Sequence, residues 1–350
     1  MRGPSPRAST GLISPGSWAL PSPSRSITSS PGPASAAKCP PPWPRVAPVR
    51  EDAVVGIAQW LPRPGQAREN LATAVRLSGD LARRGADLIV LPELWPCGFD
   101  WGSLHHDAAG AAETLDGPRC AALAACARDL GVWLAAGSVP ESHGSALFNT
   151  ALLFDRRGRL RAWHRKAHLY SPLGEADIFT PGDQLTVCPT DEFGMVGLSV
   201  CFDGDFPEVA RAMRDAGARL VIQPCAYETA ARGWWRTLYP AHALSNGQWW
   251  VLANQCGTNP SGTLLGESQV ISPSGDVLAR ARGAADGETP PAELMTVPVP
   301  LARELARAEQ DNGVLRSLRR PDLKVQLEDE LRPDAYGLAA EAASSARHER

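Results

Sequence analysis

The sequence lacks any uninterrupted apolar run of about 18 residues, the length that a helix needs to cross a bilayer. It also lacks a large excess of either charge, because 35 lysines and arginines stand against 38 acids, for a formal net charge of -3. Without a basic surface field, neither nucleic acid nor an acidic membrane is the expected partner. These absences predict a cytoplasmic protein that neither enters a membrane nor binds nucleic acid.

Closely paired cysteines are missing as well. The eight cysteines are scattered through apolar segments, with no Cys-x-x-Cys pair and no accompanying pair of histidines. This pattern argues against a structural zinc site and against a dense disulfide framework, and it favours a reducing compartment.

The first 48 residues lack acids. They hold twelve prolines and ten serines but no Asp or Glu, a composition that buries too little apolar surface to offset the entropy of ordering. We therefore expect residues 1–48 to be disordered. The Arg and Ser bias is typical of a targeting segment, although the proline density opposes the helix of a transit peptide. A mis-assigned translation start fits the composition equally well.

Residues 52–300 alternate apolar runs with amphipathic stretches, which predicts one α/β domain. Because its strands are almost wholly apolar, both faces of each sheet should be covered, as in two sheets packed between two helix layers. Residues 301–350 are expected to form a helical and polar arm, either at a subunit contact or as a loose tail. The expected strands are 54–59, 87–91, 132–136, 147–154, 159–164, 195–200, 219–223, 249–254, 267–272 and 276–281, and the expected helices are 66–84, 111–130, 206–216 and 234–246.

Two segments place a charged residue directly after a predicted strand. Glu93 follows the apolar run that ends in Leu91-Pro92, at the carboxyl end of a strand, where open α/β sheets bind ligands. Lys166 is one of only three lysines among the 35 basic residues, so its retention indicates a need for a compact ammonium that Arg does not replace. The alternatives are a helix cap or surface acid for Glu93 and a solvated lysine for Lys166.

Cys201 ends the apolar run 197–201, and a sharp turn separates it from a helix with proline in its first turn. A nucleophile at a strand-to-helix turn is exposed to substrate, and the nearby backbone N–H groups can bind an oxyanion. The alternative is an inert cysteine that packs as a small apolar side chain.

In this order, the strings LPE, RKAHL and GLSVCFDGDFPE make residues 53 to about 300 resemble the nitrilase superfamily of carbon–nitrogen hydrolases, in its branch of amidases and N-carbamoyl amine amidohydrolases. The resemblance implies an α/β fold of the four-layer αββα sandwich type and a catalytic triad of Glu93, Lys166 and Cys201. It also implies that Glu175, in the Gly-Glu pair before Phe-Thr-Pro-Gly-Asp, helps to position the substrate and couples to the base.

The same resemblance implies a mechanism. Glu93 accepts the thiol proton as Cys201 attacks the amide carbon, while Lys166 and the backbone N–H of Phe202 hold the oxyanion. Such a base is needed because an ordinary thiol is only a few per cent ionised at neutral pH. A thioester forms, ammonia leaves, and Glu93 then activates water. The reaction requires no metal or organic cofactor.

These strings do not distinguish a primary amide from an N-carbamoyl amine or a nitrile, and amide transfer or a non-catalytic role are further alternatives. Asp205 stands where many relatives carry Arg, which favours a neutral or cationic substrate over an anion. Capping of a helix beginning at Phe206 is the alternative role for Asp205. The residues expected to line the mouth of the pocket are Phe202, Asp203, Tyr227, Glu228, Trp234 and Trp235.

The resemblance also bears on partners. A small-molecule amide or carbamoyl compound is the expected substrate. Relatives pair through helices near the active site, so a homodimer or a larger homo-oligomer is expected, with the helices at 206–216 and 234–246 as its contact surface.

Overall fold

The structure is a computed structural model that describes residues 49–285 and 292–312. The expected disorder of residues 1–48 and the part of the expected arm at 313–350 lie outside the described residues. Within them, no helix is both long and apolar enough to span a membrane.

The first sheet has six strands in the described residues, in the order β14-β1-β2-β3-β4-β5. Strands β1, β2 and β3 are parallel, whereas β4, β5 and β14 are antiparallel to their neighbours. The strands expected at 147–154 and 159–164 are β4 and β5, which pair as an antiparallel hairpin. The strands are β1 (Ala53–Gln59), β2 (Leu88–Val90), β3 (Trp133–His143), β4 (Ala146–Phe154), β5 (Leu160–Arg165) and β14 (Glu293–Val299).

The second sheet also has six described strands, in the order β13-β12-β9-β8-β7-β6, with β7, β8 and β9 parallel. A separate two-stranded hairpin is formed by β10 (Cys256–Asn259) and β11 (Gly262–Leu265). The remaining strands are β6 (Thr186–Pro189), β7 (Met195–Leu198), β8 (Leu220–Cys225), β9 (Trp249–Asn254), β12 (Gln269–Ile271) and β13 (Val277–Arg280).

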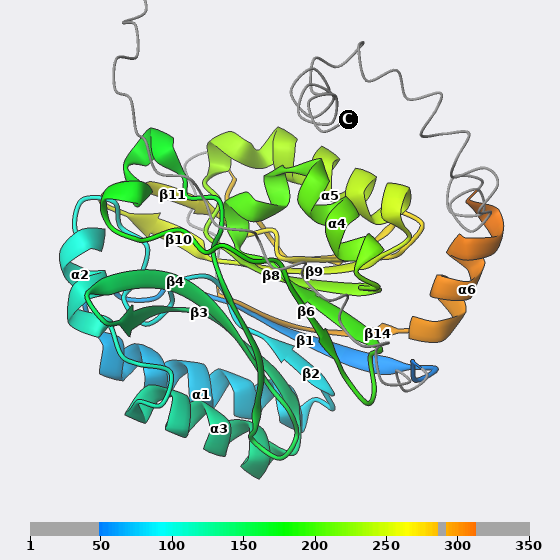
Figure 1. Ribbon diagram of the computed structural model, residues 1–350, viewed down its shortest axis with the longest axis horizontal. Helices are drawn as coiled ribbons and strands as arrows, with labels where there is room; N and C mark the ends of the chain where they lie inside the picture. The colour runs from blue at the N-terminus through cyan, green and yellow to red at the C-terminus, as the bar shows by residue number, and fades with distance from the viewer. Residues whose placement is uncertain (1–48, 286–291, 313–350) are drawn as a thin grey trace, which may run out of the picture. The chain divides into compact units, whose positions relative to one another are not determined.

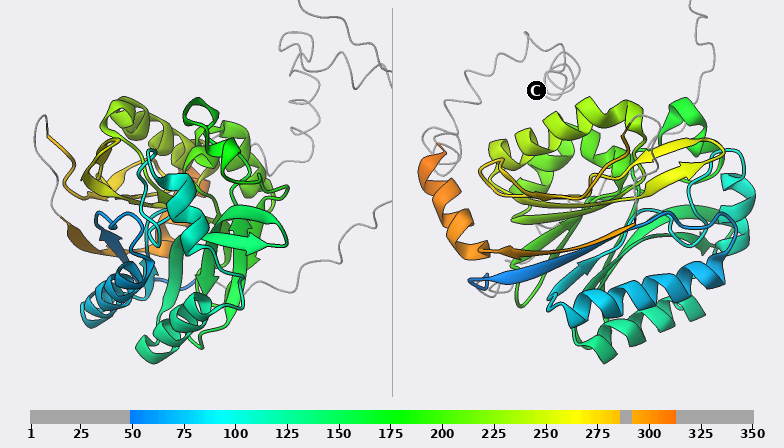
Figure 2. Two further views of the ribbon diagram at one scale, coloured as in Figure 1. Left: turned by 90° about the vertical axis from the view of Figure 1, so that its left-hand side faces the viewer. Right: turned by 180° about the vertical axis from the view of Figure 1, so that it is seen from behind.

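The two sheets pack face to face, and helices cover their outer faces (Figures 1 and 2). Helices α1 (Ala67–Arg83) and α3 (Pro118–Leu130) cover the first sheet, and α4 (Pro207–Asp215) and α5 (Arg232–Asn246) cover the second. Helix α2 (Leu104–Ala111) contributes to a smaller apolar cluster, and α6 (Leu301–Asp311) follows β14. The expected four-layer sandwich is therefore confirmed.

Strand β2 shows why an almost wholly apolar strand predicted this arrangement. Leu88 and Val90 point into the core between the sheets, whereas Ile89 points to the core beneath α1 and α3. Strand β9 alternates in the same way, with Trp249 and Val251 between the sheets and Trp250 toward α5. Since side chains alternate between the faces of a strand, a strand that is buried on both faces must be apolar throughout.

The single helix expected over residues 111–130 is wrong. The chain forms α2, then a turn, and then α3, which begins at Pro118. Proline disfavours helical geometry in the residue before it and is well suited to the first helical position, so the helix starts at Pro118 and does not run through Gly117.

Four described strands, β6, β10, β11 and β14, were not expected. Strand β14 contains a proline, which weakened its signal, but it lies at the edge of the first sheet, where proline is tolerated.

Candidate active site

Four residues singled out in the sequence converge at the carboxyl ends of the parallel strands. Glu93 follows β2, Lys166 follows β5, and Glu175 begins the short 3-10 helix η2 (Glu175–Asp177). Cys201 begins the 3-10 helix η3 (Cys201–Asp205), three residues after the end of β7. The N–H of Glu93 donates to the carbonyl of Cys225 at the end of β8, at 3.4 Å, so the ends of the two sheets meet here.

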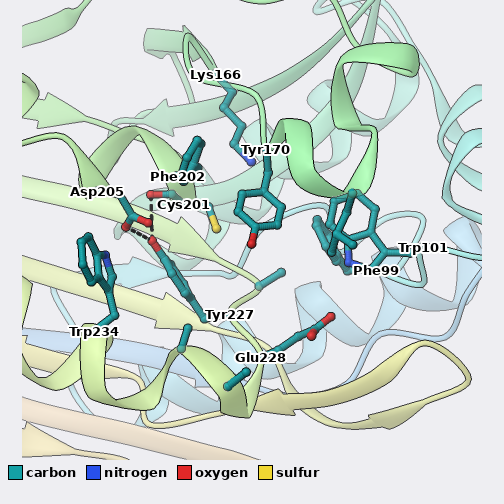
Figure 3. Close-up of a pocket in the computed structure, with 14 residues that line it drawn as sticks. Phe99, Trp101, Lys166, Tyr170, Cys201, Phe202, Asp205, Tyr227, Glu228 and Trp234 are labelled. Atoms are coloured by element: carbon teal, nitrogen blue, oxygen red, sulfur yellow. Dashed lines mark hydrogen bonds between the residues drawn. The ribbon is translucent and has the colours of Figure 1, made fainter. Parts of the chain in front are cut away.

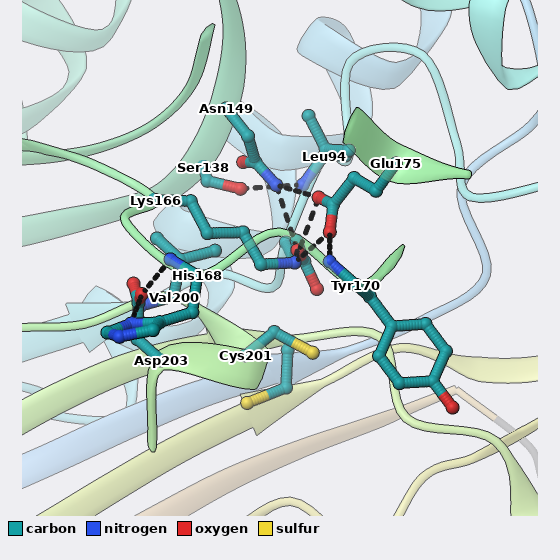
Figure 4. A network of polar contacts seen from close by, with 12 residues as sticks. Leu94, Ser138, Asn149, Lys166, His168, Tyr170, Glu175, Val200, Cys201 and Asp203 are labelled. Carbon is teal, nitrogen blue, oxygen red and sulfur yellow. Dashed lines mark hydrogen bonds and ion pairs between the residues drawn. The ribbon is translucent and has the colours of Figure 1, made fainter. Parts of the chain in front are cut away.

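Lys166 lies between two carboxylates. Its Nζ donates to Glu93 Oε1 at 3.0 Å and to the two oxygens of Glu175 at 2.9 and 2.8 Å (Figure 4). The side chains of Glu93 and Glu175 are fully buried and that of Lys166 is 1% exposed. Burial alone would lower the pKa of Lys166, but the Glu175 and Glu93 carboxylates outweigh it and raise that pKa well above its ordinary value. The amine is therefore held as a cation.

The two carboxylate oxygens of Glu93 have different surroundings. Its Oε2 is buried without a hydrogen-bond partner among the described residues, while Oε1 accepts from Lys166. Burial raises the pKa of Glu93, and the Glu175 carboxylate adds to that rise, although the Lys166 ammonium and the neighbouring Cys201 thiol oppose it. A carboxylate with a raised pKa and an open oxygen beside a thiol is suited to proton transfer.

Cys201 is a protonated thiol in this environment. Burial raises its pKa well above the ordinary value, and so do the neighbouring Cys225 thiol and the Glu93 carboxylate, while Lys166 opposes the rise. The site therefore holds no preformed thiolate at neutral pH. A base must take the thiol proton during the attack, and Glu93 is the adjacent candidate.

Two site positions have left-handed backbone. Leu94, directly after Glu93, has φ of 43°, and Cys201 has φ of 45°. Neither residue is glycine, so each conformation carries strain on the order of 1–3 kcal/mol. Buried contacts hold the first: the Leu94 N–H donates to Ser138 Oγ at 3.0 Å. The first of these left-handed residues directly follows Glu93, and the second is Cys201 itself.

Asn149 belongs to the same cluster and was not predicted. Its Nδ2 donates to Glu93 Oε1 at 2.9 Å and to Glu175 Oε1 at 3.3 Å, so it links the two carboxylates (Figure 4). A signal was available, because Asn149 is a polar residue within the otherwise largely apolar strand β4. Buried polar side chains require partners, and this residue finds them at the site.

A cavity of about 400 Å³ opens beside Cys201 (Figure 3). Figure 3 shows Phe99 and Trp101 on one side of it, Asp205 and Trp234 on the other, and the Tyr170 ring between. Among the predicted lining residues, Phe202, Asp205, Tyr227, Glu228 and Trp234 do line it, together with Lys166. Sequence reasoning missed the aromatic wall of Phe99, Trp101 and Tyr170, which lies in loops without a periodic pattern.

The capping role considered for Asp205 is wrong. Helix α4 begins at Pro207 with Phe206 as its N-cap, and no side chain caps it. The Asp205 carboxylate instead accepts hydrogen bonds from the hydroxyls of Tyr227 and Tyr239. Burial raises the pKa of Asp205, while these hydroxyls and Trp234 oppose the rise. Asp205 thus presents an acid to the cavity from a fixed position.

Two other residues expected at the mouth of the pocket lie elsewhere. Trp235 is fully buried in the core beneath α5, where its Nε1 donates to the carbonyl of Glu267 at 3.0 Å. Asp203 is also fully buried and accepts hydrogen bonds from two histidines. The prediction failed because neighbouring side chains on a helix point about 100° apart, so Trp234 lies exposed beside the cavity whereas Trp235 faces the core.

No group of His, Cys, Asp and Glu side chains within residues 49–285 and 292–312 is arranged to hold a metal ion. The described site brings together a buried carboxyl group, a buried cation and a thiol beside a cavity.

Comparison with known proteins gives the site a context. Residues 53–304 match the family model of the carbon–nitrogen hydrolases. The chain is 35% identical over 205 residues to a 2-oxoglutaramate amidase of Paenarthrobacter nicotinovorans, covering 56% of this chain and 68% of the relative. It is 31% identical over 293 residues to a chloroplastic omega-amidase of Arabidopsis thaliana, covering 79% of this chain and 78% of the relative.

Among solved structures, a Saccharomyces cerevisiae member of branch 10 of the nitrilase superfamily is similar to this chain, with a TM-score of 0.69. The match covers 78% of this chain and 98% of the other, at 22% sequence identity. At that sequence identity the similarity supports a shared fold and nothing more specific.

Proposed function

This chain belongs to the carbon–nitrogen hydrolase family, and from that premise we propose that it hydrolyses a small primary amide. The part of the substrate beyond the amide group is uncharged or cationic, and the reaction passes through a thioester on Cys201. Its family and its relatives, which are named 2-oxoglutaramate amidase and omega-amidase, identify it as an amide-hydrolysing enzyme. The observation that carries the mechanism is the buried Glu93–Lys166–Glu175 cluster beside a cysteine that faces a cavity.

The proposed reaction begins as the sulfur of Cys201 attacks the amide carbon and Glu93 takes the thiol proton. The negative charge that develops on the carbonyl oxygen is stabilised by the Lys166 ammonium and by the backbone N–H of Phe202, in the first turn of η3. Glu93 then protonates the departing nitrogen, so ammonia leaves and a thioester remains. Water, deprotonated by Glu93, hydrolyses the thioester and restores the thiol.

The charges around the cavity support the proposed substrate class. Lys166 is the one cation among the described lining residues, and Glu93 and Glu175 already neutralise it. Asp205 and Glu228 contribute carboxyl groups, and the Glu228 carboxylate forms no hydrogen bond or ion pair with another described residue. A substrate carboxylate would find no opposite charge here and would be repelled, whereas an ammonium or a neutral chain would not.

The test compares three primary amides of equal length: pentanamide, 5-aminopentanamide and the anion glutaramate, with 2-oxoglutaramate as a fourth compound. Ammonia release is measured for the wild-type chain and for Cys201→Ala. We expect kcat/KM for the neutral and cationic amides to exceed that for the anions by about tenfold or more, since one unfavourable charge contact is worth about 1.4 kcal/mol.

The outcomes separate the two parts of the proposal. Loss of turnover in Cys201→Ala, with activity kept in the control Cys126→Ala, whose thiol lies in the core beneath α1 and α3, supports the nucleophile. Turnover that survives Cys201→Ala would overturn the mechanism. A preference for glutaramate or 2-oxoglutaramate would overturn the substrate class and leave the mechanism intact. Ammonia release from a nitrile and an N-carbamoyl compound with the same carbon chain as each amide establishes which bond is cleaved fastest.

A further inference from the structure

Asp203 lies two residues after Cys201 in the 3-10 helix η3, and no step of the proposed reaction uses it. Its side chain is 1% exposed. Burial would raise the pKa of Asp203, but the hydrogen bonds from His164 and His168 outweigh it and lower that pKa well below the ordinary range. The group is thus a buried carboxylate that stays ionised at neutral pH, so its surroundings must supply donors.

One set of donors comes from the segment that carries Lys166. The backbone N–H groups of Ala167 and His168, the two residues that follow Lys166, donate to Asp203 Oδ1 at 3.0 and 2.8 Å. The His168 ring adds a third contact to the same oxygen, from Nδ1 at 2.9 Å. A single carboxylate oxygen therefore fixes the backbone directly after Lys166.

The other oxygen faces the strand that leads to Cys201. Asp203 Oδ2 accepts from the backbone N–H of Val200, directly before Cys201, at 3.1 Å. It also accepts from Nε2 of His164 in β5 at 2.9 Å. Figure 4 shows Asp203 beside His168 and Val200. Lys166 stands two residues before His168 in the sequence, and Cys201 directly follows Val200.

Lys166 is tied to its surroundings on the other side by different bonds. Its backbone N–H donates to the carbonyl of Asn149 at 2.8 Å, and its carbonyl accepts from the N–H of Gly182 at 2.8 Å. These bonds link Lys166 to β4 and to the segment before β6. Hydrogen bonds to Asp203 join the Lys166 segment to the turn that carries Cys201, and the His168 ring also stacks on Phe206, with ring centroids 4.1 Å apart.

We propose that Asp203 is a positioning residue for amide hydrolysis: its carboxylate sets the distance between the Lys166 ammonium and the carbon attacked by Cys201. The inference rests on the proposed function, because Lys166 matters in this way only if an oxyanion forms beside it. An amide in place of the carboxylate would present N–H groups to backbone N–H donors on one of its two sides, so the two segments would shift apart.

The central experiment is Asp203→Asn, measured with pentanamide. A displacement of about 1 Å at a reacting centre lowers the rate by up to about a hundredfold, so we expect kcat to fall by about 10- to 100-fold with KM within about threefold. The rate at which iodoacetamide alkylates Cys201, followed by mass spectrometry, should change by less than about threefold. That alkylation displaces iodide from a CH₂ carbon and develops no oxyanion, so it does not need Lys166 at the correct distance.

A matched pair at His168 tests the same link without a fully buried change, since the His168 side chain is 37% exposed. His168→Asn keeps a donor near the position of Nδ1, whereas His168→Leu removes it. We expect kcat of His168→Asn to remain within about twofold of wild type and that of His168→Leu to fall by about three- to tenfold, with KM unchanged in both.

Several outcomes would overturn the inference. These are a folded Asp203→Asn chain with wild-type kcat, an equal fall of turnover and of Cys201 alkylation, and equal kcat values for the two His168 variants. An equal fall in amide turnover and in Cys201 alkylation would mean that the substitution had disrupted the structure of the whole site. If Asp203→Asn does not fold, the His168 pair alone decides. A wild-type chain without amide turnover would instead overturn the proposed function, and this inference with it.

Discussion

At the scale of the single residue, the physical role of Lys166 follows from its surroundings. The sequence showed only that lysine is scarce, with three among 35 basic residues. The structure adds that Nζ lies between Glu93 and Glu175, within 2.8 to 3.0 Å of three carboxylate oxygens, and that the Lys166 side chain is 1% exposed. A compact ammonium fits this space, whereas the planar guanidinium of Arg needs more room and directs its donors differently.

Lys166→Arg should therefore lose most of the activity although it keeps the charge. Because the oxyanion would lose a correctly placed donor, we expect kcat to fall by about 100-fold or more. Steady-state ammonia release with pentanamide measures the loss. Arg157→Lys, at an exposed position in the β4–β5 turn, serves as a control and should keep wild-type activity. An active Lys166→Arg chain would show that charge alone suffices.

The pH dependence of kcat/KM should show the state of Glu93. The base must be ionised to accept the thiol proton, so activity is lost as the pH falls through the pKa of Glu93. Burial raises that pKa above the ordinary value of 4.5, which moves the acid limb of the profile upward. A profile measured with a neutral amide tests this, since the substrate does not titrate. An acid limb at or below the ordinary range of a carboxyl group would contradict the assignment.

The thiol gives an independent reading of the same site. Burial raises the pKa of Cys201, so the fraction of thiolate is small at neutral pH and grows only as the pH rises well above it. The rate of alkylation of Cys201 by iodoacetamide should therefore keep increasing with pH beyond the region where amide turnover has become constant. Coincident profiles for the two reactions would indicate a preformed thiolate.

At the scale of the element, the hairpin of β10 and β11 positions one wall of the cavity. Asn259 Nδ2 donates to the carbonyl of Phe99 at 2.5 Å, and the N–H of Gly102 donates to Ser261 Oγ at 3.1 Å. Ser261 Oγ also donates to the carboxylate of Asp100. These bonds hold the loop that carries Phe99 and Trp101, both of which line the cavity. The hairpin thus supports the wall, although none of its described residues lines the cavity.

Ser261→Ala should weaken substrate binding more than it slows the chemistry. Loss of the Ser261 hydroxyl frees the loop that carries Trp101, so we expect KM to rise by about three- to tenfold with kcat within about twofold, as one hydrogen bond is worth about 0.5–1.5 kcal/mol. Steady-state kinetics with pentanamide measure both. Thr263→Ala removes an exposed hydroxyl from the same hairpin, one that pairs with Thr258, and should change neither. A larger fall in kcat than rise in KM would contradict this role.

At the scale of the molecule, an ion-pair network joins loops at the ends of strands in both sheets. Arg156, in the turn between β4 and β5, donates to Glu192 at 2.6 and 2.8 Å and to Asp87 at 2.9 Å. Arg50, before β1, pairs with the same two carboxylates. Partial burial opposes ionisation of Asp87 and Glu192, but hydrogen bonds and charge outweigh it and lower the pKa of each. At Asp87 these come from the Val54 N–H, Arg156 and Arg50, and at Glu192 from Arg156, Trp133 and Arg50.

Arg156→Leu should destabilise the fold in a pH-dependent way. We expect the free energy of unfolding to fall by about 1–2 kcal/mol at pH 7, a value reduced for the partial exposure of Arg156. Carboxyl groups with a lowered pKa stabilise the fold above their ordinary pKa, and that contribution is lost as the pH falls below it. The difference from wild type in urea unfolding should therefore shrink below about pH 4. Arg157→Leu is the control, and an undiminished difference at low pH would contradict the assignment.

The sequence by itself determined the layered fold, because strand burial leaves a local signal. It also supplied Glu93, Lys166 and Cys201 as candidates, whereas Glu175 was predicted only from the resemblance to a family. A strand buried on both faces must be apolar throughout, and Glu93 and Cys201 each stand shortly after such a strand, while Lys166 directly follows the partly exposed strand β5. Proline position, also local, separates α2 from α3.

Only the tertiary structure decided which side chains meet. Asp203 was expected at the pocket and is instead a buried link between the Lys166 and Cys201 segments, and Asn149 joins two carboxylates that lie 82 positions apart in the sequence, at 93 and 175. Periodic patterns in a sequence show which face a residue occupies along a strand or helix. They do not show what lies opposite a turn or a loop, because that neighbour arrives only when distant segments pack together.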